Sequence, residues 1–127
     1  MKPFSAELLQ KAFCGKRVLV TGHTGFKGSW LTHLLSQWGA EIHGYALEPE
    51  GPLFDSLALP APLRLHIADI RDFDRVQKTV EDFRPEIVFH LAAQALVRRS
   101  YALPRETFEV NVGGLVNVME AIRRSTS

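Results

Sequence analysis

Three glycines, Gly22, Gly25 and Gly28, give the sequence its clearest chemical signal, within the segment TGHTGFKG. A short apolar run precedes them at 17–21, and helical periodicity follows at 25–38. Glycines at a strand-to-helix turn let the backbone approach a phosphate, which then faces free N–H groups and the positive end of the helix dipole. The pattern predicts a turn that binds a dinucleotide pyrophosphate, and a glycine-rich turn without a ligand is the alternative.

Each glycine has an expected task in such a turn. Gly22 allows the tight turn, Gly25 the close approach of phosphate, and Gly28 the close packing of the helix against the strand. A P-loop, the nearest other phosphate-binding motif, requires Gly-Lys-Ser/Thr. Here the order is Lys27-Gly28-Ser29, so a P-loop is excluded.

The end of the second expected strand bears on the choice of dinucleotide. An acidic residue that binds the adenosine ribose usually stands there, about 20 residues after the glycines. In this chain the position holds Ala46 or Leu47, Glu48 comes slightly late, and no Arg is present for a 2′-phosphate. The pattern favours NAD over NADP.

The elements that must position the glycine turn alternate between short apolar runs and helical periodicity. We expect strands at 17–21, 41–46, 63–67 and 86–91, helices at 25–38, 72–83 and 105–124, and a loop with room for one short helical turn at 48–62. This alternation indicates a Rossmann-like, doubly wound α/β fold with a parallel sheet of about four strands. We assign 1–14 to an N-terminal extension and 15–127 to a partial NAD-binding domain.

Two helices have informative apolar patterns. The helix at 25–38 is expected to carry an apolar side made of Phe26, Trp30, Leu31, Leu34, Leu35 and Trp38. The helix at 105–124 has two apolar faces, one with Phe108, Val112, Leu115, Val116, Met119 and Ile122, the other with Val110, Val118 and Ala121. A helix that is apolar nearly all round is buried on both sides. One face can pack on the sheet, and the other needs a partner.

Composition and charge narrow the possible partners. Of the 127 residues 46% are hydrophobic and 23% charged, and the formal net charge is +1, so nothing favours nucleic acid or an anionic membrane. No apolar run approaches the roughly 20 residues that span a bilayer, and the N-terminus lacks a signal peptide's apolar core. The one cysteine, Cys14, is expected to be small, buried and reduced. The reduced cysteine and the lack of a signal peptide predict a cytoplasmic protein. The histidines lack metal-ligand spacing, so we expect no bound metal.

Further segments match a known family together with the glycine turn. They are Asp69-Ile70-Arg71-Asp72 after the third strand, His90-Leu91-Ala92-Ala93-Gln94 at the end of the fourth, VRRSYALP at 97–104, and Asn111-Val112-Gly113-Gly114 in the last helix. The chain resembles the extended short-chain dehydrogenase/reductase family of nucleotide-sugar enzymes. The strings TGHTGFKGSWL, DIRDF and PEIVFHLAAQ are most similar to its CDP-D-glucose 4,6-dehydratase group. Relatives usually have Gly-Thr where this chain has Gly114-Leu115, so we expect no hydrogen bond from a threonine hydroxyl there.

The resemblance implies NAD as the cofactor and a role for each matching residue. The pyrophosphate would be bound by Gly22, Thr24, Gly25, Phe26, Lys27 and Gly28. Asp69 and Ile70 would contact the adenine, with the carboxylate accepting from its exocyclic amine. Leu91, Ala92 and Ala93 would lie under the nicotinamide and its ribose, and Gln94 at the mouth of the sugar site. Asn111 would bend the last helix and support the hydrogen bonds of the site.

The catalytic residues that the resemblance calls for are missing from these 127 residues. The family uses a Tyr-x-x-x-Lys pair, in which the lysine lowers the tyrosine pKa. Here Tyr45 has no lysine four residues on, and Tyr101 has Arg105 there, after the helix-interrupting Pro104. We expect the N-terminal half of an enzyme that oxidises C4 of a nucleotide sugar such as CDP-glucose, eliminates water across C5–C6 and reduces C6.

On this basis the chain alone is expected to be inactive. The alternatives are a stand-alone dinucleotide-binding module and an interaction module that completes its sheet with another polypeptide. We also expect a homodimer or aggregation. The helix at 105–124 corresponds to the face through which relatives form dimers, and the strand at 86–91 would be left as an apolar sheet edge.

Overall fold

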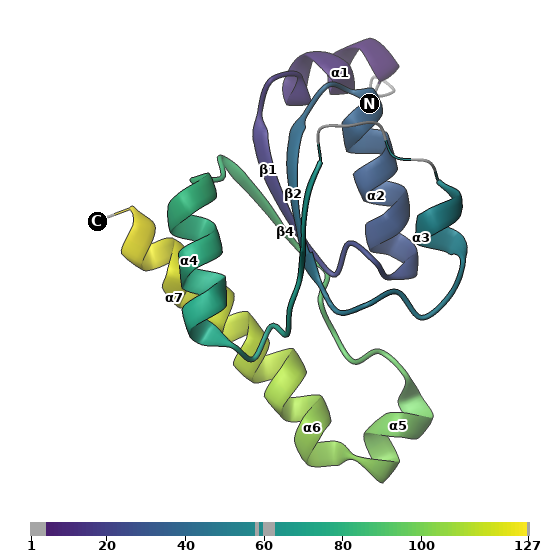
Figure 1. Ribbon diagram of the computed structural model, residues 1–127, viewed down its shortest axis with the longest axis vertical. Coiled ribbons are helices and arrows are strands. Elements are labelled where there is room, and N and C mark those ends of the chain that lie inside the picture. Colours follow the sequence, from purple (N-terminus) through teal and green to yellow (C-terminus); the bar gives the residue numbers. More distant parts are fainter. Residues whose placement is uncertain (1–4, 58, 60–62, 127) are drawn as a thin grey trace.

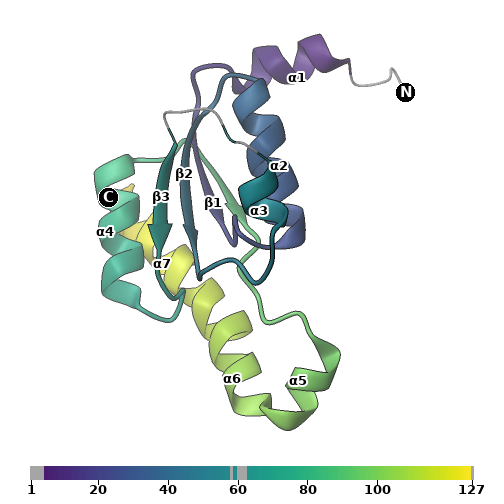
Figure 2. The ribbon, with the colours of Figure 1, turned by 45° about the vertical axis from the view of Figure 1, so that its right-hand side comes forward.

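One parallel sheet organises the chain. The computed structural model describes residues 5–57, 59 and 63–126. In this part of the chain the strands are β1 (Arg17–Thr21), β2 (Glu41–Ala46), β3 (Arg64–Ile67) and β4 (Ile87–His90). All neighbours are parallel and the order is β3-β2-β1-β4, as Figures 1 and 2 show. The Rossmann-like α/β fold predicted from the sequence is confirmed.

Helices cover both faces of the sheet. They are α1 (Ala6–Phe13), α2 (Phe26–Gln37), α3 (Leu53–Ser56), α4 (Phe73–Phe83), α5 (Val97–Ala102), α6 (Pro104–Phe108), the π-helical turn η1 (Glu109–Gly113) and α7 (Gly114–Ser125). Helices α2 and α3 lie on one side of the sheet, α4 and α7 on the other (Figure 1). Parallel strands need crossovers of this kind, and covering both faces buries the apolar strands.

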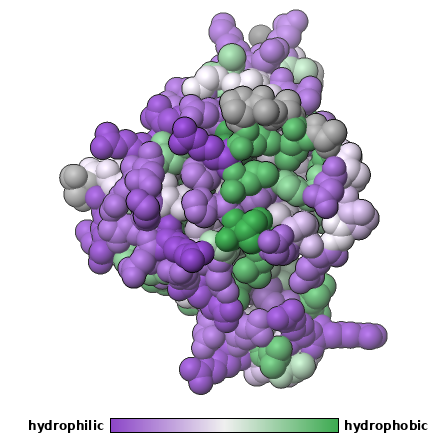
Figure 3. Space-filling view, viewed as in Figure 1, coloured by the Kyte–Doolittle hydropathy of each residue, from purple (hydrophilic) through white to green (hydrophobic). Residues whose placement is uncertain are grey.

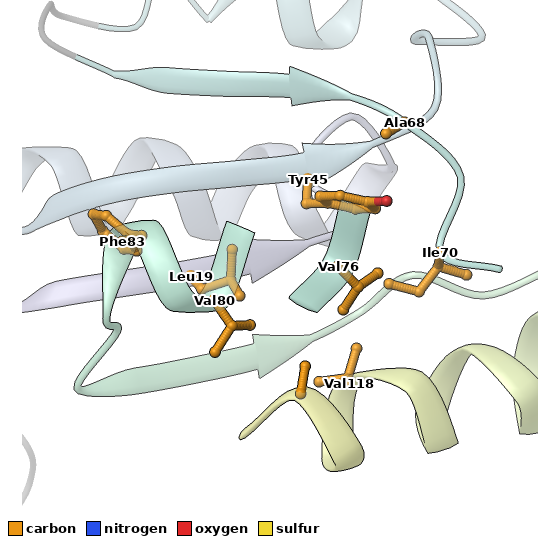
Figure 4. Close-up of a cluster of buried hydrophobic side chains, with 9 residues drawn as sticks. Leu19, Tyr45, Ala68, Ile70, Val76, Val80, Phe83 and Val118 are labelled. Atoms are coloured by element: carbon orange, nitrogen blue, oxygen red, sulfur yellow. The ribbon is translucent and has the colours of Figure 1, made fainter. Parts of the chain in front are cut away.

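The two faces of the sheet have separate apolar cores. On the side of α4 and α7, the buried cluster is Leu19, Tyr45, Ala68, Ile70, Val76, Val80, Phe83, Val118 and Ala121 (Figure 4). On the side of α2, it is Val18, Val20, Leu35 and Ile42. Successive residues of β1 therefore point to opposite faces, as a doubly wound sheet requires.

Helix α2 buries only part of the side that its apolar pattern predicts, because Leu31, Leu35 and Trp38 pack in the core and the other three residues do not. Its buried residues are Gly28, Ser29, Thr32 and Leu35. Phe26, by contrast, is 73% exposed, and Trp30 and Leu34 are exposed as well. The helix lies so close to the end of β1 that only small side chains have room between them, so the expected apolar side faces outward in part.

Three further features differ from the sequence-based expectation. The expected N-terminal extension contains helix α1, capped by Ser5, whose side-chain oxygen accepts from Leu8 N at 3.2 Å; residues 1–4 of it lie outside the described part. Helix α5 was not among the expected helices; it has only six residues. Cys14 is exposed rather than buried, because it is the C-cap residue of α1 and follows the helix's last turn.

The last helix runs without a break through three segments, α6, η1 and α7 (Figure 1). The predicted helix at 105–124 is therefore right in extent but contains a π-helical turn at its centre. Of its two apolar faces, one packs on the core through Val118 and Ala121. The other, with Val112, Val116 and Met119, is exposed.

Apolar surface also remains at the two sheet edges. Strand β3 forms one edge, and its Leu65 and Ile67 are exposed; Figure 3 shows a hydrophobic band in this region, between α4 and α2. Strand β4 forms the other edge of the described sheet, and all its residues are only half-buried. No helix in the described part of the chain is long and apolar enough to cross a bilayer.

Two buried histidines add a pH-sensitive element to the fold. The ring of His23 is fully buried and meets the Phe54 ring edge-on at 5.3 Å. His43 is buried beside Phe83, with its Nε2 3.4 Å from His66 Nδ1. Burial, and then the nearby His43, lowers the pKa of His23 to about 4. Burial, and then His66, lowers the pKa of His43 to about 4.

These pKa values predict loss of stability on mild acidification. Both rings are neutral in the folded chain, whereas in the unfolded chain they bind protons below about pH 6.5. Above pH 6.5 the two histidines therefore do not lower the free energy of unfolding. As the pH drops toward 4 this free energy falls, by up to about 1.4 kcal/mol per pH unit for each histidine. Urea unfolding between pH 5 and 7.5 measures this slope. His43→Leu should lower this slope by the contribution of His43, up to about 1.4 kcal/mol per pH unit, and an unchanged slope in that variant would contradict the assignment.

Candidate functional site

The candidate site lies where the carboxyl ends of the strands meet. The chain leaves β1 toward α2 on one face, and leaves β4 toward helices that end on the other face. A sheet of this kind opens a crevice between two such strands, and ligands bind there. The segments that line this edge are the glycine turn at 22–28, the loop at 69–71 and the loop at 91–94.

The glycine turn is pressed against the loop that follows β4. Gly22 has a φ of +75°, and a Cβ added to it would lie 2.6 Å from Ala92 N and 2.7 Å from Leu91 C. A Cβ on Gly28 would collide with the carbonyl oxygen of Gly22. The tight turn expected at Gly22 and the close packing expected at Gly28 are both present. No residue with a side chain can replace either glycine without moving the backbone.

Gly25 has a different position from the other two glycines. It is the N-cap residue of α2, with an ordinary φ of −73°, and it is exposed. Its N–H donates to Gly22 O at 3.0 Å, which closes the turn. Helix α2 has no side chain that caps its N-terminus. The first N–H groups of a helix lack partners within it, so this end can bind an anion.

The other residues expected at the pyrophosphate surround this helix end. Thr24 Oγ1 donates to Leu47 O at 2.8 Å and ties the turn to the end of β2. Phe26 and Lys27 are exposed in the first turn of α2. The Lys27 ammonium is thus on the same end of the helix as the free N–H groups, where a cation adds to the attraction for phosphate.

A hydroxyl that sequence reasoning missed joins β1 to the β4 loop. Thr21 Oγ1 accepts from Leu91 N at 3.1 Å and from Ala92 N at 3.2 Å, and lies 2.7 Å from His90 Nδ1. The Thr21 hydroxyl and the His90 ring thus share a hydrogen bond beside the two backbone N–H groups. Burial lowers the pKa of His90, which keeps this ring neutral. The sequence does hold one signal for Thr21: it is a polar residue at the end of an otherwise apolar strand.

The side-chain amide of Asn111 forms two hydrogen bonds with the backbone of Gln94. Gln94 N donates to Asn111 Oδ1 at 2.7 Å, and Asn111 Nδ2 donates to Gln94 O at 3.1 Å. The Gln94 side chain bonds within the chain too, to Leu96 N at 2.7 Å and Thr107 Oγ1 at 3.1 Å. Because Asn111 is the central residue of η1, the π-helical turn places the amide that holds the β4 loop. Such turns recur at functional sites.

The loop after β3 is fixed from two sides. Tyr45 Oη donates to Asp69 O at 2.8 Å, and Figure 4 shows this hydroxyl pointing toward the loop that carries Ile70. Asn117 Nδ2 donates to Ile70 O at 2.9 Å. A Cβ on Gly114 would lie 2.6 Å from Ile70 Cγ2, so this glycine lets the loop rest on α7. Sequence reasoning missed Tyr45 and Asn117, whose polar ends have no spacing pattern.

The structure thus brings the predicted site residues to one edge of the sheet in three groups, the glycine turn, the Asp69–Ile70 pair and the loop from Leu91 to Gln94. Asn111 joins the third group. In the described residues no group of three or more His, Cys, Asp or Glu side chains could hold a metal ion. The arrangement can bind an extended ligand with a central anionic group along the carboxyl edge.

Relatives among known proteins cover most of this chain. The family model described as GDP-mannose 4,6 dehydratase matches residues 19–127. The CDP-glucose 4,6-dehydratase of Salmonella typhimurium is 52% identical over 112 residues, which are 87% of this chain and 31% of the relative. The GDP-mannose 4,6 dehydratase 2 of Arabidopsis thaliana is 31% identical over 122 residues, 87% of this chain and 32% of the relative. The chain thus spans about a third of the length of these relatives.

Solved structures agree with the sequence relatives. The UDP-glucose 4-epimerase of Thermus thermophilus, in complex with NAD, superimposes with a TM-score of 0.77 at 36% identity, over 87% of this chain and 34% of the epimerase. The epimerase Mth375 of Methanothermobacter thermautotrophicus gives a TM-score of 0.81 at 30% identity, over 94% and 35%. The chain therefore belongs to the GDP-mannose 4,6 dehydratase family, as its resemblance to the extended short-chain dehydrogenase/reductase enzymes predicted.

Proposed function

We propose that this chain is the NAD-binding portion of a nucleotide-sugar 4,6-dehydratase that acts on CDP-glucose. The observation that carries the proposal is the glycine turn, which presents the uncapped N-terminus of α2 beside the end of β4. The relative of known function at 52% identity supports the choice of CDP-glucose.

The residues present fit a dinucleotide along the carboxyl edge of the sheet. The glycine turn offers backbone N–H groups with no side chain above Gly25. Ala92 and Ala93 offer small side chains at the end of β4, where a flat ring can approach. Asp69 offers a carboxylate at the other end. When bound, NAD would supply a hydride acceptor for C4 of the sugar, and these residues would bind and orient it.

Binding of NAD is the first test. Gly25 is exposed and has an ordinary φ, so Gly25→Asp and Gly25→Asn should both fold, and both are good N-cap residues. Only the aspartate places a negative charge against the pyrophosphate. We expect calorimetry to show one NAD per chain in the parent protein. Gly25→Asp should weaken binding by roughly tenfold or more relative to Gly25→Asn, since like charges at close range cost more than about 1.4 kcal/mol.

The stability of each variant, from its urea midpoint, controls for unfolding. Equal NAD affinities in the two variants would contradict a pyrophosphate at this turn. Absence of NAD binding to the folded parent chain would overturn the proposed function of this chain as a binding unit.

The chain alone should not catalyse the reaction. Burial raises the pKa of Tyr45 to about 12, and its hydroxyl is bonded to Asp69 O, so it cannot serve as the base. Tyr101 is exposed and is followed four residues later by Arg105, which does not exchange protons. Incubation of the purified chain with NAD and CDP-glucose should give no 4-keto-6-deoxy sugar, and formation of that product above the rate without protein would contradict this expectation.

We also propose that the chain forms a homodimer through the exposed face of α6, η1 and α7, defined by Phe108, Val112, Leu115, Val116 and Met119. These side chains lie along one helix surface, and each is at least 45% exposed. Contiguous apolar surface of this kind marks an interaction site. A second copy of the same face would cover it with matching apolar side chains.

Sedimentation can test this dimer with a matched pair of substitutions. Met119→Glu places a charge in the proposed interface, whereas Leu8→Glu places the same charge on α1, at a residue that is 52% exposed against 61% for Met119. We expect a dimer in the parent chain and in Leu8→Glu, and a monomer in Met119→Glu, since an unpaired charge does not enter an apolar interface. A dimer that survives Met119→Glu would instead point to the open edge of β4.

A further inference from the structure

The carboxylate of Asp69 is bound by Arg71, two residues later in the chain. Arg71 N donates to Asp69 Oδ1 at 2.9 Å, Arg71 Nε reaches Oδ1 and Oδ2 at 3.0 and 3.1 Å, and Arg71 Nη2 reaches Oδ2 at 2.6 Å. The fork-shaped guanidinium matches both oxygens at once, a geometry that a lysine cannot provide. The carboxylate is thus fixed in one orientation although it is only partly buried.

Arg71 is itself held in place from a second element. Its Nη1 lies 3.7 Å from Glu109 Oε2, and Glu109 Oε1 accepts from Arg105 Nε at 2.8 Å. A pocket of about 330 Å³ beside it is lined by Arg71, Glu109, Gly113 and Asn117. Asn117 also holds the Ile70 carbonyl. The guanidinium therefore forms one wall of a pocket at the end of the site where Asp69 lies.

The hydrogen bonds of Asp69 leave room for one more donor. An ionised carboxylate offers about four acceptor sites. Three N–H groups of Arg71, from N, Nε and Nη2, occupy three of them. One site remains, enough for a single N–H of a ligand. A carbonyl oxygen at the same place would face a carboxylate that cannot turn away and has no hydrogen to donate.

We propose that Arg71 is a positioning residue at the Asp69 end of the site, where it makes the site select a 6-aminopurine such as adenine and reject a 6-oxopurine such as hypoxanthine. The inference rests on the proposed binding of NAD. Arg71 acts through Asp69: it keeps that carboxylate in place as an acceptor for the exocyclic amine. Hydrogen bonding to Arg71 lowers the pKa of Asp69, so the acid form that could donate to an oxo group does not arise at neutral pH.

Without Arg71 the carboxylate loses both its orientation and its selectivity. Since the Asp69 side chain is 31% exposed, it can rotate toward water at little cost once the guanidinium is gone. It then neither favours an amine nor disfavours a carbonyl. The affinity ratio between an amino and an oxo ligand should therefore collapse even where the protein is fully folded.

The experiment compares NAD with nicotinamide hypoxanthine dinucleotide, in which an oxo group replaces the 6-amino group and the neighbouring N1 carries a hydrogen. Calorimetric titration of the full chain at pH 7 should give a preference for NAD on the order of tenfold, since an oxo group leaves the carboxylate facing an acceptor. Arg71→Met should reduce the preference to less than about threefold, and Arg71→Lys, which keeps the charge without the fork, should give an intermediate value. Arg75→Met is the matched control, because Arg75 pairs with Asp72 and not with Asp69.

The ratio of the two affinities separates specificity from folding and from binding as such. A tenfold preference that survives Arg71→Met and Arg71→Lys would overturn the inference and leave NAD binding intact. Equal affinities in the parent chain would do the same. Failure of the folded parent chain to bind either dinucleotide would overturn the proposed function, and the inference with it. Loss of the preference in Arg75→Met as well would assign the effect to general charge rather than to Arg71.

Discussion

The contact between two stretches of backbone, the glycine turn after β1 and the loop after β4, is the constraint on which the rest of the structure depends. Their atoms come so close at Gly22 that a single added carbon would meet Leu91 and Ala92 at distances no real side chain shows. Thr21 makes this approach stable, because its hydroxyl bonds both N–H groups of the loop. The same contact sets where α2 begins and how near the sheet it lies.

The two ends of this sheet edge differ in the charge of the groups that they present. At the glycine turn the available groups are positive, the N-terminus of α2 and the Lys27 ammonium. The loop after β3 carries an ionised carboxylate, that of Asp69, which is neutralised in part by Arg71 and held by it. A ligand that matches both ends carries an anionic centre at some distance from a hydrogen-bond donor. Dinucleotides with an adenine base have that order of groups.

The fold could be predicted from the sequence more completely than the site. The strands at 17–21 and 41–46, the turn at Gly22 and the apolar face of the last helix follow from local patterns, and the structure places them as expected. The outward side of α2 could not be predicted, because it depends on how closely Gly28 packs rather than on hydrophobicity. Thr21, Tyr45 and Asn117 were missed because each acts through a partner between 24 and 71 residues away. No window along the chain contains such pairs.

The π-helical turn η1 makes the direction of half the last helix depend on a residue count. Each residue of a helix advances it by about 100°, and a π turn accommodates one residue more than an α turn of the same length would. Removing the exposed Val112 from this turn would leave every core side chain in the sequence. It would nevertheless rotate α6 and α5 about the axis of α7 and carry Asn111 away from Gln94. In this segment the length of the chain, as much as its chemistry, encodes the shape of the site.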